Sequence, residues 1–175
     1  MHRADKMSKG EALAYKIIDS PTGKLRLIAS EKALVAIQWE KKAGDHERTG
    51  GLFRDDRHSV LVETERQLNE YFAGERREFE LPLDMRGTRF QKSVWEALLA
   101  IPFGETRSYG QIARQLGNAN ATRAVGAANG QNPIPIVVPC HRVIGSNGTL
   151  TGFGGGLGTK ARLLGLEQRG QTLFD

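Results

Sequence analysis

The first half of the chain alternates hydrophobic and polar residues in short runs and then changes to a helical repeat. Residues 15–30 are typical of two strands around a Pro-Thr-Gly turn, and residues 32–40 of a third strand. Residues 44–51 are polar and glycine-containing, which predicts a loop. In residues 58–75 apolar side chains recur at helical spacing up to Gly74, a typical C-terminal cap. The pattern therefore predicts a small antiparallel sheet with one helix.

The second half begins with helical patterns. Residues 88–101 carry apolar side chains at helical spacing and stop before Pro102. Two short helices are expected at 109–116 and 121–129, separated by a tight turn at Gly117, which is a helix-turn-helix pattern. The expected N-caps of the three helices are Thr88, Ser108 and Asn120. The small residues of the last helix suit close packing against the core as well as against another surface.

The rest of the chain combines a short apolar run, a glycine-rich loop and a final helix. Ile136–Val138 predicts a short buried strand, and Cys140 just beyond it falls where a turn or a helix start is expected. Residues 145–158 contain seven glycines but no GxxxxGK[ST] pattern, which argues against a nucleoside triphosphate site and favours a flexible wall beside a ligand. Residues 159–170 predict a closing helix that ends at Gly170.

Together these elements predict an α+β protein, in which a sheet-and-helix domain of residues 1–86 packs on a mainly helical domain of residues 87–175. The net charge of +5 is distributed in the same way. Residues 1–87 carry 16 basic and 16 acidic side chains, whereas residues 88–175 carry nine and four. No Asp or Glu occurs in residues 106–166. Such a stretch suits a polyanion such as nucleic acid, although a mildly basic surface without a partner fits the same charge.

Composition argues against several classes of protein. No run approaches 18 consecutive apolar residues, so no transmembrane helix is expected, and the N-terminal residues lack the apolar segment of a signal peptide. The single cysteine, Cys140, cannot form an internal disulfide or a multi-cysteine zinc site. We therefore expect a cytoplasmic protein that has no metal site.

Cys140 is followed directly by His141, which suggests a nucleophile with its base. Neighbours on a strand point to opposite faces, so contact between the two side chains needs a turn or a bridging water. The base also needs an orienting group. Glu167, on the expected buried face of the closing helix, is the best placed of the few carboxylates. From the residues alone, Cys140 fits a reactive nucleophile and a buried structural cysteine equally well.

The sequence around Cys140 resembles a known active-site signature. Residues 132–145, NPIPIVVPCHRVIG, are similar to that of the O6-alkylguanine-DNA alkyltransferases. Residues 108–133 resemble the helix-turn-helix of this family, and residues 162–170 its closing helix. The resemblance is specific from Arg89 to Gly170 and weaker over residues 14–80.

The resemblance implies repair of double-stranded DNA that carries O6-alkylguanine, and also O4-alkylthymine. The alkyl group would pass irreversibly to Cys140 after the target nucleotide is flipped out of the duplex. His141 would be the base, acting through a water, Glu167 would orient His141, and Asn132 would brace the turn before the cysteine. The family implies a monomer without cofactors and leaves cooperative binding along DNA open.

Further residues acquire roles by the same resemblance. Arg123 is similar to the residue that fills the space left by the flipped nucleotide. Tyr109 is similar to the one that helps rotate the target and hydrogen-bonds guanine N3. The residues expected to touch the DNA backbone are Gly110, Asn118 and Ser146. The residues expected to line the base pocket are Tyr109, Val143, Phe153 and Gly154. Phe153 stands where many members of the family have tyrosine, which leaves the accepted alkyl size open.

Three other functions are compatible with parts of the pattern. A protein of this fold that binds lesions without repairing them would not need the cysteine. A thiol hydrolase using Cys140 and His141 would turn over and would not need Arg123. A helix-turn-helix regulator would bind DNA in a sequence-specific manner.

Overall fold

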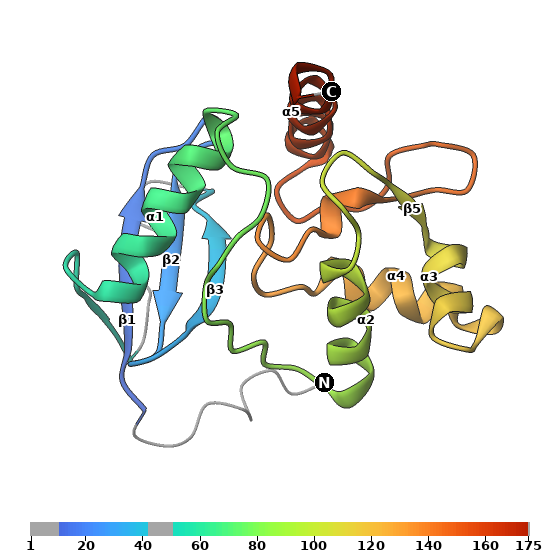
Figure 1. Ribbon diagram of the computed structural model, residues 1–175. Helices are drawn as coiled ribbons and strands as arrows, with labels where there is room; N and C mark the ends of the chain where they lie inside the picture. Colours follow the sequence, from blue (N-terminus) through green and yellow to red (C-terminus); the bar gives the residue numbers. More distant parts are fainter. Residues whose placement is uncertain (1–10, 42–50, 175) are drawn as a thin grey trace. The chain divides into compact units, whose positions relative to one another are not determined.

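The computed structural model describes residues 11–41 and 51–174, and of residues 171–174 only the helical backbone. The loop predicted at residues 44–51 lies almost wholly outside the described residues. The chain divides into two compact units, residues 1–87 and residues 88–175 (Figure 1). The observed division falls one residue after the boundary expected from the sequence.

A four-stranded sheet forms the first unit. Its strands are β1 (Leu13–Ile18), β2 (Leu25–Ala29), β3 (Leu34–Trp39) and β4 (Leu52–Arg54), in the order β3-β2-β1-β4. The first three strands pair antiparallel, as predicted. β4 pairs parallel with β1, so the sheet is mixed and the prediction of a purely antiparallel sheet was wrong. A three-residue strand is too short to show alternation, and its partner lies far away in the sequence.

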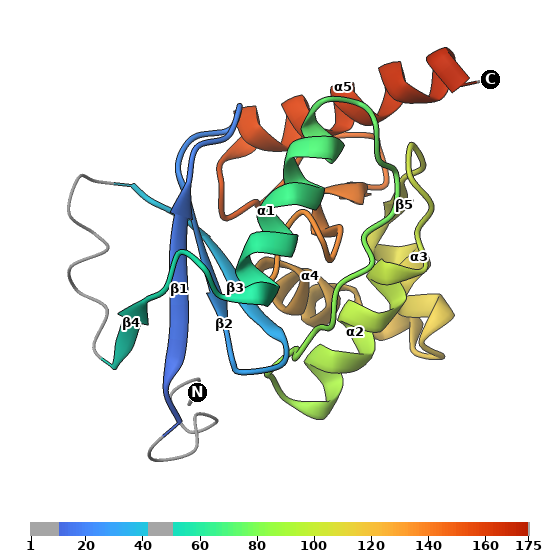
Figure 2. The same ribbon diagram turned by 60° about the vertical axis from the view of Figure 1, so that its left-hand side comes forward.

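Helix α1 (Ser59–Phe72) covers one face of this sheet (Figures 1 and 2). His58 caps its first turn, because its Nδ1 accepts a hydrogen bond from the backbone N–H of Val60. Leu61, Leu68 and Tyr71 form its buried face. Burial of each such side chain contributes roughly 2 kcal/mol, so this face attaches α1 firmly to the sheet.

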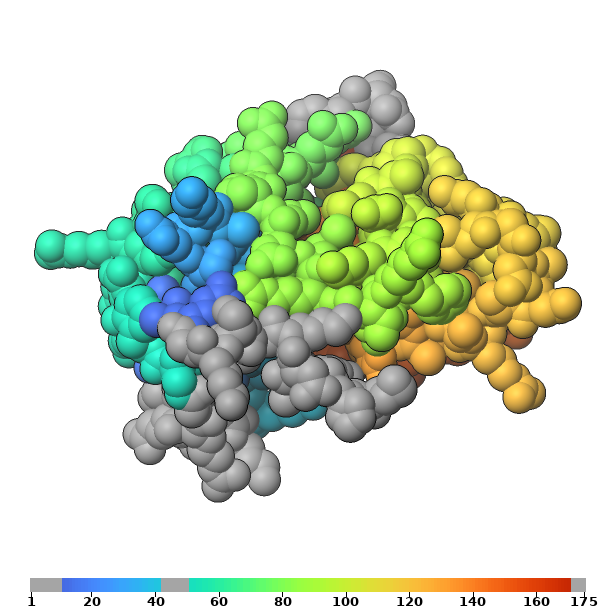
Figure 3. Space-filling view, turned by 90° about the horizontal axis from the view of Figure 1, so that it is seen from below, coloured from blue at the N-terminus to red at the C-terminus, as the bar shows by residue number. Residues whose placement is uncertain are grey.

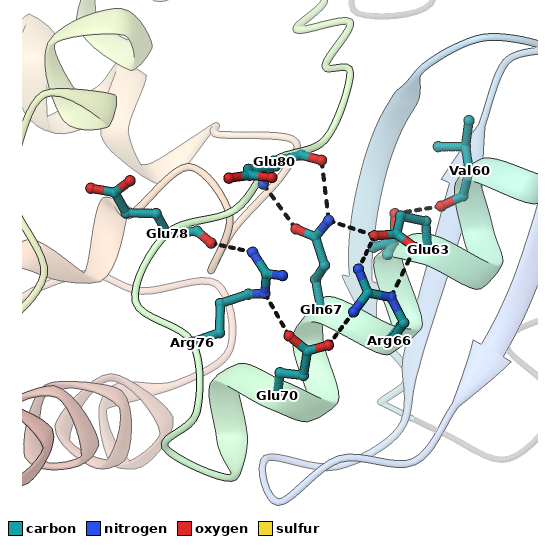
Figure 4. Close-up of polar contacts among 9 residues, drawn as sticks. Val60, Glu63, Arg66, Gln67, Glu70, Arg76, Glu78 and Glu80 are labelled. Carbon is teal, nitrogen blue, oxygen red and sulfur yellow. Dashed lines mark hydrogen bonds and ion pairs between the residues drawn. The ribbon is translucent and has the colours of Figure 1, made fainter.

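The segment that follows α1 is held to the first unit by polar contacts (Figure 4). The buried side-chain amide of Gln67 donates to the carbonyl of Glu80 (3.1 Å) and accepts from its N–H (2.9 Å). Further along, the N–H of Leu34 at the start of β3 donates to the carbonyl of Pro82 (2.8 Å). These contacts make the segment up to Gly87 part of the first unit.

Three helices open the second unit, and two of their predicted caps are confirmed. They are α2 (Arg89–Leu99), α3 (Tyr109–Gln115) and α4 (Thr122–Gly130). Thr88 and Ser108 both form capping boxes with the glutamine three residues later. Asn120 is not a cap, because a 3₁₀ turn, η3 (Ala119–Ala121), precedes α4. Asn118 caps this turn instead, accepting from the N–H of Asn120.

The core of the second unit joins α2 to α4. The indole N–H of the buried Trp95 on α2 donates to the carbonyl of Ala128 on α4 (2.8 Å). Residues 110–125, drawn in yellow, lie on the surface that Figure 3 shows. The helix-turn-helix is therefore fixed from its inner side and open on its outer side.

Ile136–Val138 is buried, as expected, but it is not a strand. The run forms a tight turn in which Pro135 bridges to Val138, and Ile136 has φ +73°. A positive φ is costly for a β-branched residue, so the surrounding packing must hold this turn in place. The sequence pattern showed the burial of the run but not its backbone conformation.

The chain then passes through a 3₁₀ turn, η4 (Cys140–Arg142), and strand β6 (Val143–Ile144), which pairs with β5 (Arg107–Ser108). The closing helix α5 (Leu157–Phe174) is longer than predicted and continues through Gly170. A Cβ at Gly170 would lie 3.1 Å from the Phe103 ring. The glycine therefore allows close packing and does not end the helix.

Candidate active site

Cys140 is the first residue of η4 and is buried, with 4% of its surface exposed. The expected helix start after the apolar run is therefore present, as a 3₁₀ turn. Cys140 and His141 lie on this turn and not on a strand, so the rule that neighbouring side chains point to opposite faces does not apply to them. The backbone N–H of Cys140 donates to the carbonyl of Val138 (2.8 Å), which anchors the turn.

A buried ion network lies directly beside this turn. His141 Nε2 is 2.6 Å from Glu167 Oε2, and Arg142 donates to both oxygens of Glu167 from Nε (2.7 Å) and Nη2 (3.1 Å). Arg142 Nη1 also donates to the carbonyl of Ile101 (2.7 Å). The structure thus brings together the predicted His141 and Glu167, and adds Arg142, which sequence reasoning had counted only as a basic residue.

The pKa values of this network follow from its contacts. Burial alone would raise the pKa of Glu167, but hydrogen bonds and charge from His141 and Arg142 outweigh it and lower the pKa to about 2. Burial lowers the pKa of His141, and Glu167 opposes that effect only in part. At neutral pH the site therefore holds an ionised Glu167 and a neutral His141.

The second ring nitrogen of His141 is the atom available for chemistry. Nδ1 is buried and has no hydrogen-bond partner among the residues that the structure describes. Because the ionised Glu167 accepts at Nε2, the proton of the neutral ring is held there, and Nδ1 carries a free lone pair. The network thus prepares His141 as a proton acceptor on the side away from Glu167.

The thiol of Cys140 needs a proton acceptor, because its surroundings disfavour the thiolate. Burial raises its pKa to about 11, while a hydrogen bond from Asn132 and the charge of Lys160 act in the opposite direction. Asn132 also donates to the carbonyl of Val138 (2.8 Å) and accepts from the N–H of Ile134 (2.9 Å), so it braces the turn before the cysteine.

A second asparagine was missed by the sequence reasoning. Asn129, buried on α4, donates from Nδ2 to the carbonyl of Cys140 (3.3 Å). Nothing in the sequence separates it from the neighbouring small and polar residues. It connects the second helix of the helix-turn-helix directly to the cysteine.

Lys160 was missed as well, and it is fully buried on α5. Its ammonium donates to the carbonyls of Val143 (2.6 Å) and Thr151 (2.9 Å) and lies 5.9 Å from the centre of the Tyr109 ring. Burial lowers its pKa. A signal was present in the sequence, because Lys160, Leu163 and Glu167 are spaced by three and four residues and share one helix face.

The expected pocket residues occupy different environments. Tyr109 is half-buried at the start of α3, and its Oη accepts a hydrogen bond from the hydroxyl of Thr151 (3.0 Å). Val143 is buried, and Lys160 links its carbonyl to the loop that carries Thr151. Phe153 is half-buried and Gly154 is exposed on that loop. The structure therefore connects Tyr109, Val143 and the glycine-rich loop through polar contacts.

The expected DNA contacts lie on separate segments. Arg123 is exposed on the first turn of α4 and forms no ion pair with the part of the chain that the structure describes. Asn118 is exposed in the turn before α4, Ser146 is exposed after β6, and Gly110 is half-buried on α3. Three of the four are thus exposed on the surface of the second unit.

Within residues 11–41 and 51–174, no group of three His, Cys, Asp or Glu side chains could hold a metal ion. Over the same residues, no helix combines the length and the apolar character needed to cross a membrane.

Comparison with protein families gives two matches that together cover most of the chain. Residues 89–169 match the DNA-binding domain of 6-O-methylguanine DNA methyltransferase, and residues 13–85 match its ribonuclease-like domain. The methylated-DNA–protein-cysteine methyltransferase of Mycobacterium tuberculosis strain H37Rv is 51% identical, covering 92% of this chain and 98% of its own. That of Methanosarcina acetivorans is 48% identical, over 87% and 97% of the two chains.

Solved structures agree with these relatives. The crystal structure of Mycobacterium tuberculosis O6-methylguanine methyltransferase matches with a TM-score of 0.82 and 50% identity, over 93% of this chain and 99% of its own. A crystal structure of the same organism's OGT in complex with DNA matches with a TM-score of 0.81, 50% identity and the same coverage.

Proposed function

Because the chain belongs to the 6-O-methylguanine DNA methyltransferase family, we propose that Cys140 accepts the alkyl group in its reaction. The protein repairs DNA by direct transfer of an alkyl group from O6-alkylguanine to a cysteine of its own chain. Cys140 is the only cysteine in the sequence, and it lies beside the buried His141–Glu167 pair. That single observation supports the assignment most strongly.

The proton of the thiol is the first obstacle to transfer. A pKa of about 11 leaves only on the order of one thiol in 10⁴ ionised at pH 7. His141 Nδ1 takes this proton through a bridging water, and Glu167 holds the ring in the required tautomer. The positive charge of Lys160 and the amide of Asn132 stabilise the thiolate that results.

The thiolate then displaces guanine from the alkyl carbon. A bond forms between Cys140 Sγ and that carbon while the bond from carbon to O6 breaks, and the electron pair leaves with the guanine. The negative charge that develops on the purine needs a hydrogen-bond donor, and Tyr109 supplies one at N3. The thioether has no proton or leaving group left to exchange, so each molecule acts once.

The helix-turn-helix presents the damaged nucleotide to this site. A base stacked inside a duplex cannot be attacked at O6, so the nucleotide must be flipped out. Arg123, exposed on a helix of small residues, fills the space that the nucleotide leaves. Gly110, Asn118 and Ser146 contact the DNA backbone around it. A cytoplasmic location is part of the same proposal, because Cys140 must stay reduced to react.

The test is a stoichiometric transfer followed by peptide mass measurement. The protein is incubated with an excess of duplex DNA containing O6-methylguanine, digested, and examined by mass spectrometry. We expect the Cys140 peptide to gain the mass of one CH2 group, in at most one copy per molecule. Cys140→Ala, the control, should still bind the duplex but remove no methyl group.

Other results would overturn the proposal. An unchanged Cys140 peptide alongside normal DNA binding would indicate a protein that recognises lesions without repairing them. Release of product beyond one equivalent per molecule would indicate a hydrolase.

A further inference from the structure

We propose that Thr151 is a positioning residue for Tyr109, whose hydroxyl group it orients so that the phenol proton is directed to the flipped base. This inference rests on the proposed function, because it concerns the donor that stabilises the departing guanine. Thr151 lies on the glycine-rich loop, 42 residues from Tyr109 in the sequence. Neither the sequence motif nor the family signature around Cys140 includes it.

The argument starts from the two hydroxyl groups. Thr151 Oγ1 donates to Tyr109 Oη at 3.0 Å, so one lone pair of the phenol oxygen is occupied by the loop. A phenol has a single proton, and here its acceptor within the described residues is the carbonyl of Thr151 at 3.4 Å. A bond of that length is weak, so the proton is readily available to a better acceptor.

Lys160 explains why that carbonyl does not retain the phenol proton. Its ammonium donates to the Thr151 carbonyl at 2.9 Å, and a charged donor at this distance makes the stronger bond. The same ammonium donates to the carbonyl of Val143 at 2.6 Å. Lys160 therefore fixes the backbone of Thr151 against β6, and the threonine hydroxyl keeps its place beside Tyr109.

The ring of Tyr109 is limited on its other side by α4. A Cβ added at Gly126 would lie 3.8 Å from the Tyr109 ring, so the ring packs closely against the backbone of that helix. The ring is thus positioned by α4 and the oxygen by Thr151. A hydroxyl that already accepts one hydrogen bond is also a stronger donor in the next one. Thr151 therefore prepares Tyr109 to donate to a ring nitrogen of the base.

The experiment compares two substrates and a double-mutant cycle. Single-turnover methyl transfer is measured with duplexes containing O6-methylguanine or its 3-deaza analogue, which lacks the N3 acceptor. We expect Thr151→Val to slow transfer from O6-methylguanine about 3- to 10-fold, the effect of one hydrogen bond, and to leave transfer from the 3-deaza analogue unchanged. Thr151→Ser keeps the hydroxyl and should restore most of the rate.

The cycle with Tyr109→Phe separates this inference from the proposed function. In that background, Thr151→Val should have no further effect, because the partner oxygen is gone. If Thr151→Val leaves both substrates unchanged, or slows both equally, Thr151 does not position Tyr109. If Tyr109→Phe itself slows both substrates equally, the role proposed for Tyr109 at N3 is wrong, whatever Thr151 does.

Discussion

Glu63 in the first unit and Glu167 in the second both have a pKa lowered to about 2, yet their surroundings differ completely. Hydrogen bonds from Arg66 and Gln67 lower the pKa of Glu63, whose side chain is 41% exposed. Glu167 is 1% exposed, and its contacts with His141 and Arg142 must overcome the cost of burial. Equal pKa values thus arise from a solvated ion pair in one unit and a desolvated network in the other.

The difference between the solvated and the desolvated network bears on which of the two has a chemical role. Solvated ion pairs such as those in Figure 4 contribute little to stability and can be lost with small effect. Removal of one partner from a buried network leaves a charge unpaired and costs several kcal/mol. Well-packed apolar residues would give similar stability, so we propose that the use of the network beside Cys140 is chemical.

The largest expected effect follows from removing the buried carboxylate. Glu167→Gln leaves the buried Arg142 without its counter-charge, and we expect a loss of about 3–5 kcal/mol in the free energy of unfolding. Glu63→Gln is the matched control in the exposed network and should leave the urea midpoint almost unchanged. Equal midpoints for the two variants would show that the Glu167 network is not desolvated.

The next effect is the dependence of the free energy of unfolding on pH and on salt concentration. Because the folded pKa of Glu167 is below its ordinary value of 4.5, its contribution to stability is complete above pH 4.5 and is lost as the pH falls towards 2. The shift corresponds to about 3 kcal/mol, and urea unfolding across this range should show it as a difference between the unmodified protein and Glu167→Gln. The difference should persist in 1 M salt, which screens exposed pairs such as Glu63–Arg66 but not buried ones.

Substitution of Lys160 should change the free energy of unfolding only a little but should clearly slow methyl transfer. Lys160→Met removes a buried charge and two hydrogen bonds, and these changes largely offset each other in the free energy of unfolding. The Cys140 thiolate loses a charge that lowers the pKa of the thiol, so methyl transfer should slow several-fold. Lys24→Met, at an exposed ion pair, should alter neither quantity. An unchanged transfer rate in Lys160→Met would exclude an electrostatic role.

Local signals explain what the sequence could predict. Thr88 and Ser108 were found as caps because a capping box involves only residues close in sequence. Cys140, His141 and Glu167 could be proposed from the sequence because the first two are adjacent and carboxylates are scarce in that half of the chain, and the structure places His141 and Glu167 in contact. The α+β fold class was also predicted correctly, because the hydrophobic periodicity of most helices and strands is clear in the sequence.

The remaining features depend on contacts between distant segments. Strand β4 is defined by pairing with β1, and the turn at Ile136 by packing that outweighs its preferred backbone conformation. Arg142 and Lys160 entered the sequence analysis only in the count of basic residues, because composition alone does not show that a basic residue is buried. One sequence signal did indicate that Lys160 is buried: its spacing places it on the same helix face as Leu163 and Glu167.

The most direct test of the central role given to the buried network is the pH dependence of single-turnover methyl transfer for the unmodified protein and folded Glu167→Gln. Because burial lowers the pKa of His141, the unmodified protein should keep its rate below pH 6.5, where an exposed histidine would already be protonated. Glu167→Gln should be slower at every pH, because His141 is no longer held as a proton acceptor. Profiles that overlay in rate and shape would contradict the account.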